Sequence, residues 1–147
     1  MTPNKFYSTI LVLIQLITSA AIFLTGSIWV DGLLLKALFL AGILLAIWAI
    51  LTIKLKNLQI SPEINHGGSL VKSGPYRFIR HPMYASLLLV TLILIINDFS
   101  IPRFFLWVLL TADILLKLSY EEKLLLIHFE DYTNYRKQTY ALIPKIF

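Results

Sequence analysis

The stretch FYSTILVLIQLITSAAIFLTGSIWV, residues 6–30, contains no charged side chain. A helix needs about 20 apolar residues to cross the hydrocarbon core of a bilayer, which is about 30 Å thick. Residues 6–30 exceed that length, so they predict a helix that spans a membrane.

Three further apolar runs cover residues 32–53, 82–97 and 102–120. Lys36 lies near one end of the first run, and a lysine there can extend its ammonium to the interface. The run 82–97 is short, so it needs little tilt or a locally thinner bilayer. We therefore expect an all-α integral membrane protein in which residues 1–147 form one domain with four transmembrane helices.

The composition supports this class of protein. Hydrophobic residues make up 58% of the chain and charged residues 14%, whereas a soluble domain has about 45–50% and about 25%. These values exclude a water-soluble single domain and a disordered chain. The chain has no cysteine, which excludes disulfides and thiolate metal ligands, and we expect no metal site.

The 13 lysine and arginine residues are distributed unevenly around the four runs. If both termini lie in the cytoplasm, 11 of the 13 face it, and only Lys36 and Arg103 lie outside. This asymmetry follows the positive-inside rule and predicts an N-in, C-in topology. The net charge of +5 is thereby explained by the membrane, and we expect no nucleic-acid partner. The cytoplasmic sequence is then residues 54–81 and 119–147.

The first cytoplasmic segment ends with GSLVKSGPYRFIRHPMY, residues 68–84. Pro82 suits the first turn of a helix, which places Arg80 and His81 at that helix's N-terminus. Unpaired N–H groups and the helix dipole stabilise an anion there, such as a ligand carboxylate. Taken singly, Arg80 also suits an anchor to lipid phosphates, and Tyr84 an interfacial aromatic.

The second cytoplasmic segment continues the last helix and carries adjacent carboxylates. Glu122 falls on the apolar stripe that begins at Leu118, whereas Glu121 is rotated by about 100°. We therefore expect Glu122 to face the packed side, where a carboxylate needs a cationic partner. Two kinds of partner remain open, a salt bridge to Arg77 or Arg80 and a cationic ligand.

Within the fourth run, Asp113 and Lys117 are four residues apart. This spacing favours an ion pair on one helix face. A small four-helix transporter is the alternative from another functional class, but such carriers usually need an ionisable group in a central cavity. An Asp113 paired with Lys117 would not supply one, and a purely structural protein would leave the cytoplasmic motif unexplained.

The pattern L-V-x-x-G-P-Y-x-x-x-R-H-P-x-Y over residues 70–84, with Glu-Glu at 121–122 and Ile-Pro at 143–144, resembles the isoprenylcysteine carboxyl methyltransferase family. Phospholipid N-methyltransferases are its more distant relatives. The resemblance implies an integral-membrane enzyme that uses S-adenosylmethionine at the cytoplasmic face, under the C-terminal segment. In a prokaryote it would lie in the inner membrane. A lipophilic or prenylated acceptor would reach it from the bilayer, and the oligomeric state stays open.

The same resemblance implies roles for individual residues. Arg80 and His81 are the candidate catalytic residues. Lys117 lies beside the position where relatives that methylate prenylcysteine carry an arginine for the substrate, so it is the candidate substrate contact. A carboxylate acceptor needs no general base, whereas an amine or thiol must lose a proton, for which His81 is the candidate. The implied cofactor contacts are Gly68, Ser69, Leu70, Val71, Tyr76, His81, Pro82, Met83, Tyr84, and Glu122 or Glu121.

Overall fold

The structure is a computed structural model that describes residues 4–53 and 70–147. In this part of the chain every regular element is helical, which confirms the all-α prediction. One isolated parallel bridge joins Ile79 and Tyr140. The helices are α1 (Lys5–Leu24), α2 (Leu33–Ile53), the short 3₁₀ helix η2 (Gly74–Arg77), α3 (Pro82–Asn97), α4 (Ile101–His128) and α5 (Tyr132–Gln138).

The helix boundaries follow from local chemistry. Asn4 caps α1 by accepting a hydrogen bond from the backbone N–H of Tyr7, and both α3 and α4 have a proline in their first turn. One boundary differs from the predicted ranges, and the predicted continuation of the last helix is confirmed. α1 ends at Leu24, six residues before residue 30, and the chain turns through Thr25 and Gly26. α4 continues to His128, so one helix connects the apolar bundle with the polar site.

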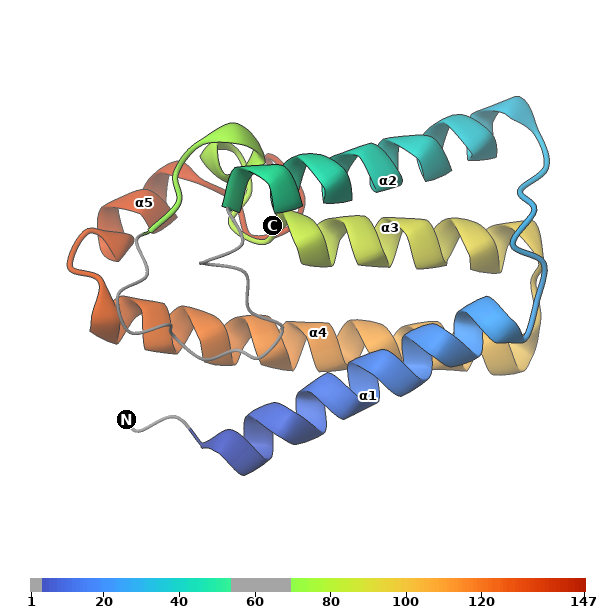
Figure 1. Cartoon of the computed structure of the whole chain (residues 1–147), viewed down its shortest axis with the longest axis horizontal. Coiled ribbons are helices and arrows are strands. Elements are labelled where there is room, and N and C mark those ends of the chain that lie inside the picture. Colours follow the sequence, from blue (N-terminus) through green and yellow to red (C-terminus); the bar gives the residue numbers. More distant parts are fainter. Residues whose placement is uncertain (1–3, 54–69) are drawn as a thin grey trace.

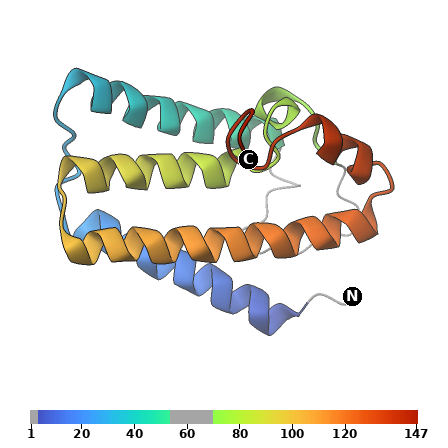
Figure 2. The same ribbon diagram turned by 180° about the vertical axis from the view of Figure 1, so that it is seen from behind.

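Figures 1 and 2 show how the helices are arranged. α2 packs along α3, α3 packs on α4, and α1 crosses α4. The connections from α1 to α2 and from α3 to α4 lie at one end of the bundle. Both termini, η2 and α5 lie at the other end, so the polar segments of the chain lie together at that end.

The outer faces of α1 and α2 are apolar and exposed. These two helices are long and apolar enough to cross a membrane in the described part of the chain, and α3 is a shorter apolar helix. Leu24 and Leu33 are 84% and 87% exposed, which indicates contact with lipid acyl chains. The described part of the chain therefore contains two candidate membrane spans, and the four-span topology stays a prediction.

A buried arginine fastens the end of the bundle opposite the termini. Arg103 in α4 donates to the carbonyl of Ile22 at 3.2 Å and to the carbonyl of Asp98. Its guanidinium also pairs with the Asp98 carboxylate at 3.3 Å, and that carboxylate accepts from the Ser27 N–H at 2.8 Å. Arg103 thus links α1 to the turn between α3 and α4.

The predicted ion pair between Asp113 and Lys117 is wrong. Lys117 Nζ donates to Gln15 Oε1 of α1 at 2.7 Å. Both carboxylate oxygens of Asp113 are buried without a hydrogen-bond partner among residues 4–53 and 70–147. The long lysine stem reaches the Gln15 amide oxygen on α1 and the ring of Tyr84 on α3, and both compete with the acid one turn away.

Close packing of α2 on α3 gives a stability prediction at Gly42. A Cβ atom at this buried position would lie 2.8 Å from Val90 Cγ2, and valine is stiff at χ1. We expect Gly42→Ala to lower the free energy of unfolding by about 1–3 kcal/mol, although alanine favours a helix. Thermal unfolding in detergent measures the change, and Val90→Ala should restore part of the loss. An unchanged midpoint for Gly42→Ala would contradict this packing.

Candidate functional site

The motif residues before α3 are held by backbone pairing with the C-terminal segment, residues 139–147. The N–H groups of Arg80 and His81 donate to the carbonyls of Tyr140 and Ala141 at 2.8 and 3.1 Å, and the Tyr140 N–H donates to Phe78 at 3.1 Å. This pairing surrounds the parallel bridge at Ile79. The C-terminal segment therefore sets the direction in which Arg80 and His81 enter the site.

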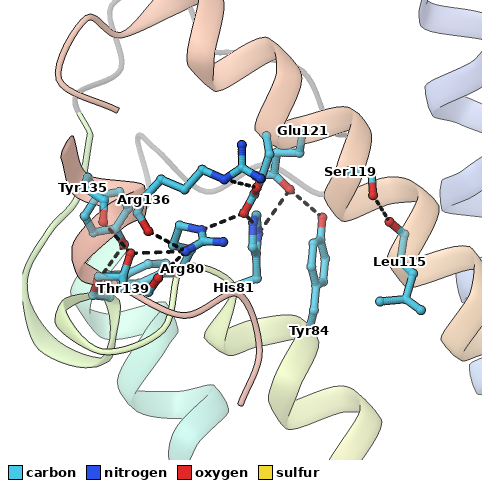
Figure 3. Close-up of polar contacts among 11 residues, drawn as sticks. Arg80, His81, Tyr84, Leu115, Ser119, Glu121, Tyr135, Arg136 and Thr139 are labelled. Carbon is cyan, nitrogen blue, oxygen red and sulfur yellow. Dashed lines mark hydrogen bonds and ion pairs between the residues drawn. The ribbon is translucent and has the colours of Figure 1, made fainter. Parts of the chain in front are cut away.

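Arg80 and Glu122 form the centre of the site. Arg80 Nε lies 2.6 Å from Glu122 Oε1, and the two side chains are 9% and 8% exposed. Arg136 Nε lies 3.3 Å from Glu122 Oε2, so two guanidinium groups share one carboxylate. Arg80 also donates to the carbonyl oxygens of Arg136 at 3.3 Å and of Thr139, as drawn in Figure 3. Of the two salt bridges considered from the sequence, the one to Arg80 forms, while Arg77 is exposed.

His81 and Tyr84 connect this centre to the second carboxylate. Their rings stack with centroids 5.5 Å apart and an interplanar angle of 8°. The Tyr84 hydroxyl donates to Glu121 Oε2 at 3.0 Å, and His81 Nδ1 lies 3.7 Å from the same oxygen. Figure 3 shows His81 and Tyr84 pointing from α3 toward Glu121 on α4. His81 Nε2 approaches Glu122 Oε1 to 3.5 Å, so the imidazole lies between the two carboxylates.

The expected difference in facing between the two glutamates is confirmed. The Glu122 side chain is 8% exposed and the Glu121 side chain 30%. Glu121 nevertheless belongs to the same cluster, because α3 lies beside α4 and brings Tyr84 to it. The position of Glu121 on its own helix does not indicate this contact, because Tyr84 belongs to another helix.

Two buried tyrosines of α5 close the site on its far side. The Tyr135 hydroxyl donates to the carbonyl of Tyr76 at 2.6 Å, which connects α5 to η2. Tyr132 is completely buried, and its hydroxyl has no hydrogen-bond partner in the described ranges 4–53 and 70–147. Burial raises the pKa of Tyr135 to about 12 and that of Tyr132 further, so both phenols stay neutral.

A family model described as the isoprenylcysteine carboxyl methyltransferase (ICMT) family matches residues 33–127, which are 95 of the 147 residues. The chain belongs to the ICMT family. The resemblance seen in the sequence is thereby confirmed, and with it a methyltransferase of this type. The other two comparisons, with curated proteins and with solved structures, gave no match.

The segment of this ICMT family member that matches the family model contains α2, α3 and nearly all of α4. It includes Arg80, His81, Tyr84 and both glutamates. Arg136 and Thr139 complete the network from beyond residue 127. Sequence reasoning missed these two residues, although the run Tyr-Thr-Asn-Tyr-Arg at 132–136 was a usable signal of an aromatic and basic element.

The remaining candidate residues of the ICMT family site lie around this network. Pro82 and Tyr76 are buried, and Leu70, Val71 and Met83 are partly buried near η2 and the start of α3. Lys117 is buried, with Nζ 5.4 Å from the centroid of the Tyr84 ring. The predicted contacts at Gly68 and Ser69 lie outside the described residues.

Lowering the pH should weaken the ion pair between Arg80 and Glu122. Burial raises the pKa of Glu122, but the neighbouring His81 and Arg80 outweigh burial and lower it from 4.5 to about 2. A lowered folded-state pKa contributes stability that is complete above the unfolded value and is lost as pH falls toward the folded value. Thermal midpoints should therefore drop between about pH 4.5 and about pH 2, and Glu122→Gln should reduce this drop. Parallel curves for the two proteins would contradict the assignment.

Proposed function

We propose that this ICMT family member transfers a methyl group from S-adenosylmethionine to a lipophilic acceptor at the cytoplasmic face of a membrane. The observation that carries the proposal is the convergence of two carboxylates, an imidazole and a tyrosine ring at the start of α3. They lie at the end of the bundle that also holds both termini (Figure 1). The predicted positive-inside asymmetry would put this end in the cytoplasm.

The residue types fit S-adenosylmethionine, which supplies an electrophilic methyl group on a sulfonium cation. The Glu121 and Glu122 carboxylates can accept hydrogen bonds from an ammonium or from ribose hydroxyls. Tyr84 offers a ring face to a cation, and the N–H groups in the first turn of α3 suit a carboxylate, because first-turn N–H groups have no partner within their own helix. The Tyr132 hydroxyl is buried and lacks a hydrogen-bond partner in the part of the chain described. Such buried polar atoms are expected where a ligand supplies the partner.

These side chains would promote methyl transfer by positioning and by excluding water. In-line displacement depends on alignment of the reacting atoms, which can account for much of the rate. Arg80 and Arg136 hold Glu122 in place, and the C-terminal segment covers His81. His81 becomes a proton acceptor only if the acceptor is an amine or a thiol.

The acceptor proposed first is a prenylcysteine-like carboxylate, in keeping with the family. A carboxylate is already a nucleophile, and Lys117, whose Nζ lies 5.4 Å from the Tyr84 ring centroid, is the cation proposed to attract it to the site before the donor binds. Phospholipid amines and small thiols are the alternatives. We further propose four membrane spans with both termini in the cytoplasm, and the inner membrane as the location in a prokaryote.

Transport is the second candidate function, and one observation favours it. Asp113 has no hydrogen-bond partner in the described residues, so it is available as the ionisable group that a carrier needs. Proton-coupled efflux from vesicles containing the purified protein would support this function. The match to a methyltransferase family makes methyl transfer the stronger proposal.

Radiolabelled methyl transfer tests the proposed function. Membranes that contain the protein should transfer label from S-adenosylmethionine into an extractable lipophilic product. Label released by base as methanol would indicate a carboxyl ester, whereas base-stable label in a lipid head group would indicate an amine. Membranes from the same cells that lack the protein serve as the control. Equal incorporation by both membranes would contradict the proposal.

A further inference from the structure

The ammonium group of Lys117 lies over the ring of Tyr84. Lys117 is 1% exposed, and its Nζ lies 5.4 Å from the Tyr84 ring centroid, within the range of a cation–π interaction. Gln15 Oε1 accepts from the same ammonium at 2.7 Å. In this structure, therefore, a positive charge already occupies one side of the ring that stacks on His81.

An unused partner for that cation lies one helical turn away. Asp113 is 3% exposed, and neither of its oxygens has a hydrogen-bond partner within residues 4–53 and 70–147. Asp113, Lys117 and Glu121 follow each other at intervals of four residues on α4, so they form one charged stripe along the helix. The flexible lysine stem lets the ammonium turn from the ring toward the Asp113 carboxylate.

A sulfonium and an ammonium compete for this ring. Like charges a few ångströms apart in a water-poor site repel strongly, so binding of a sulfonium beside Tyr84 favours departure of Lys117. The neutral sulfide of S-adenosylhomocysteine exerts no such repulsion. A buried ammonium requires a partner. The Asp113 carboxylate, which has no hydrogen-bond partner in the described residues, can accept the displaced ammonium of Lys117.

We infer that Lys117 and Asp113 form a specificity pair, in which Lys117 leaves the Tyr84 ring for Asp113 when a sulfonium binds and returns when the neutral product remains. This inference rests on the proposed function, since it assumes a sulfonium donor at Tyr84. It identifies these two residues as determinants of the preference between the charged donor and the neutral product. Lys117 thereby lowers the affinity for the donor relative to the product, and Asp113 limits that penalty.

Calorimetric titration of the full-length protein in detergent with S-adenosylmethionine and, separately, with S-adenosylhomocysteine tests the pair. Lys117→Met should strengthen sulfonium binding about tenfold relative to sulfide binding. Asp113→Asn should weaken it relative to the sulfide by a similar factor. Lys123→Met, the same exchange at an exposed position of α4, should leave the ratio of the two Kd values unchanged.

The double variant Asp113→Asn/Lys117→Met tests whether Asp113 acts by accepting Lys117 or only through the long-range effect of its own charge on the ligand. If Asp113 acts through Lys117, the Asp113→Asn change has no effect on the ratio once Lys117 is gone. Gln15→Leu gives a second route, because it removes the competing acceptor and should shift the ratio in the same direction as Lys117→Met. Equal changes in both Kd values, or additive effects in the double variant, would overturn the inference. Failure of the parent protein to bind either ligand would overturn the proposed function as well.

Discussion

Glu122→Gln is expected to weaken binding of S-adenosylhomocysteine by about 100-fold, while Glu121→Gln weakens it by about tenfold. The reason is the difference in setting between the two carboxylates. The Glu122 side chain is 8% exposed and is held by Arg80 and Arg136, whereas that of Glu121 is 30% exposed and accepts from Tyr84. Titration calorimetry of the two purified variants measures the effect.

Glu121→Gln is the matched control, because it makes the same chemical change one position away. Thermal unfolding of each variant shows how much of the effect reflects loss of the fold, since Glu122→Gln also leaves two arginines with a neutral partner. Equal losses of affinity in two folded variants would show that the position of Glu122 on the packed face has no special role in ligand binding.

Arg80→Met is expected to give the largest loss of stability in the site, about 3–5 kcal/mol. Arg80 is the buried partner of Glu122 and also donates to the carbonyls of Arg136 and Thr139. Its removal leaves the Glu122 carboxylate without its closest cation and removes the side-chain hydrogen bonds that help to hold the C-terminal segment. Thermal unfolding and limited proteolysis should show a lower midpoint and earlier cleavage near residues 139–147.

Arg77→Met is the control for that variant. Arg77 ends η2 three residues before Arg80 and is exposed, so its replacement should change stability by about 0.5 kcal/mol or less. Similar midpoints and cleavage patterns for the Arg77 and Arg80 variants would mean that the Arg80 network does not hold the C-terminal segment.

Periodicity and charge along single helices were enough to predict much of the molecule. The uncharged run 6–30 predicted a helix where α1 lies, and Pro82 marked the start of α3. The stripe that contains Glu122 predicted its burial, and the need for a cation led to Arg80 as one of two candidate partners. Each of these inferences depends on neighbours within one helix or on one strong electrostatic requirement.

Features set by contacts between distant segments could not be predicted. Arg136 reaches Glu122 only because the chain turns back after α4 through α5. Lys117 bonds to Gln15, 102 residues away in the sequence, and so leaves Asp113 without the local partner that a four-residue spacing indicates. α1 ends before residue 30, and just beyond its end Gly26 lies so close to the buried Arg103 that a Cβ there would clash with the guanidinium. That contact is absent from any local pattern.

The central claim is that the site at the start of α3 binds S-adenosylmethionine, and its neutral product is the most direct probe of that claim. Calorimetric titration of the detergent-purified protein with S-adenosylhomocysteine should give saturable binding with one site per chain, and Glu122→Gln should abolish most of the heat. Absence of binding up to about 1 mM ligand, a free energy weaker than about −4 kcal/mol, would contradict the claim.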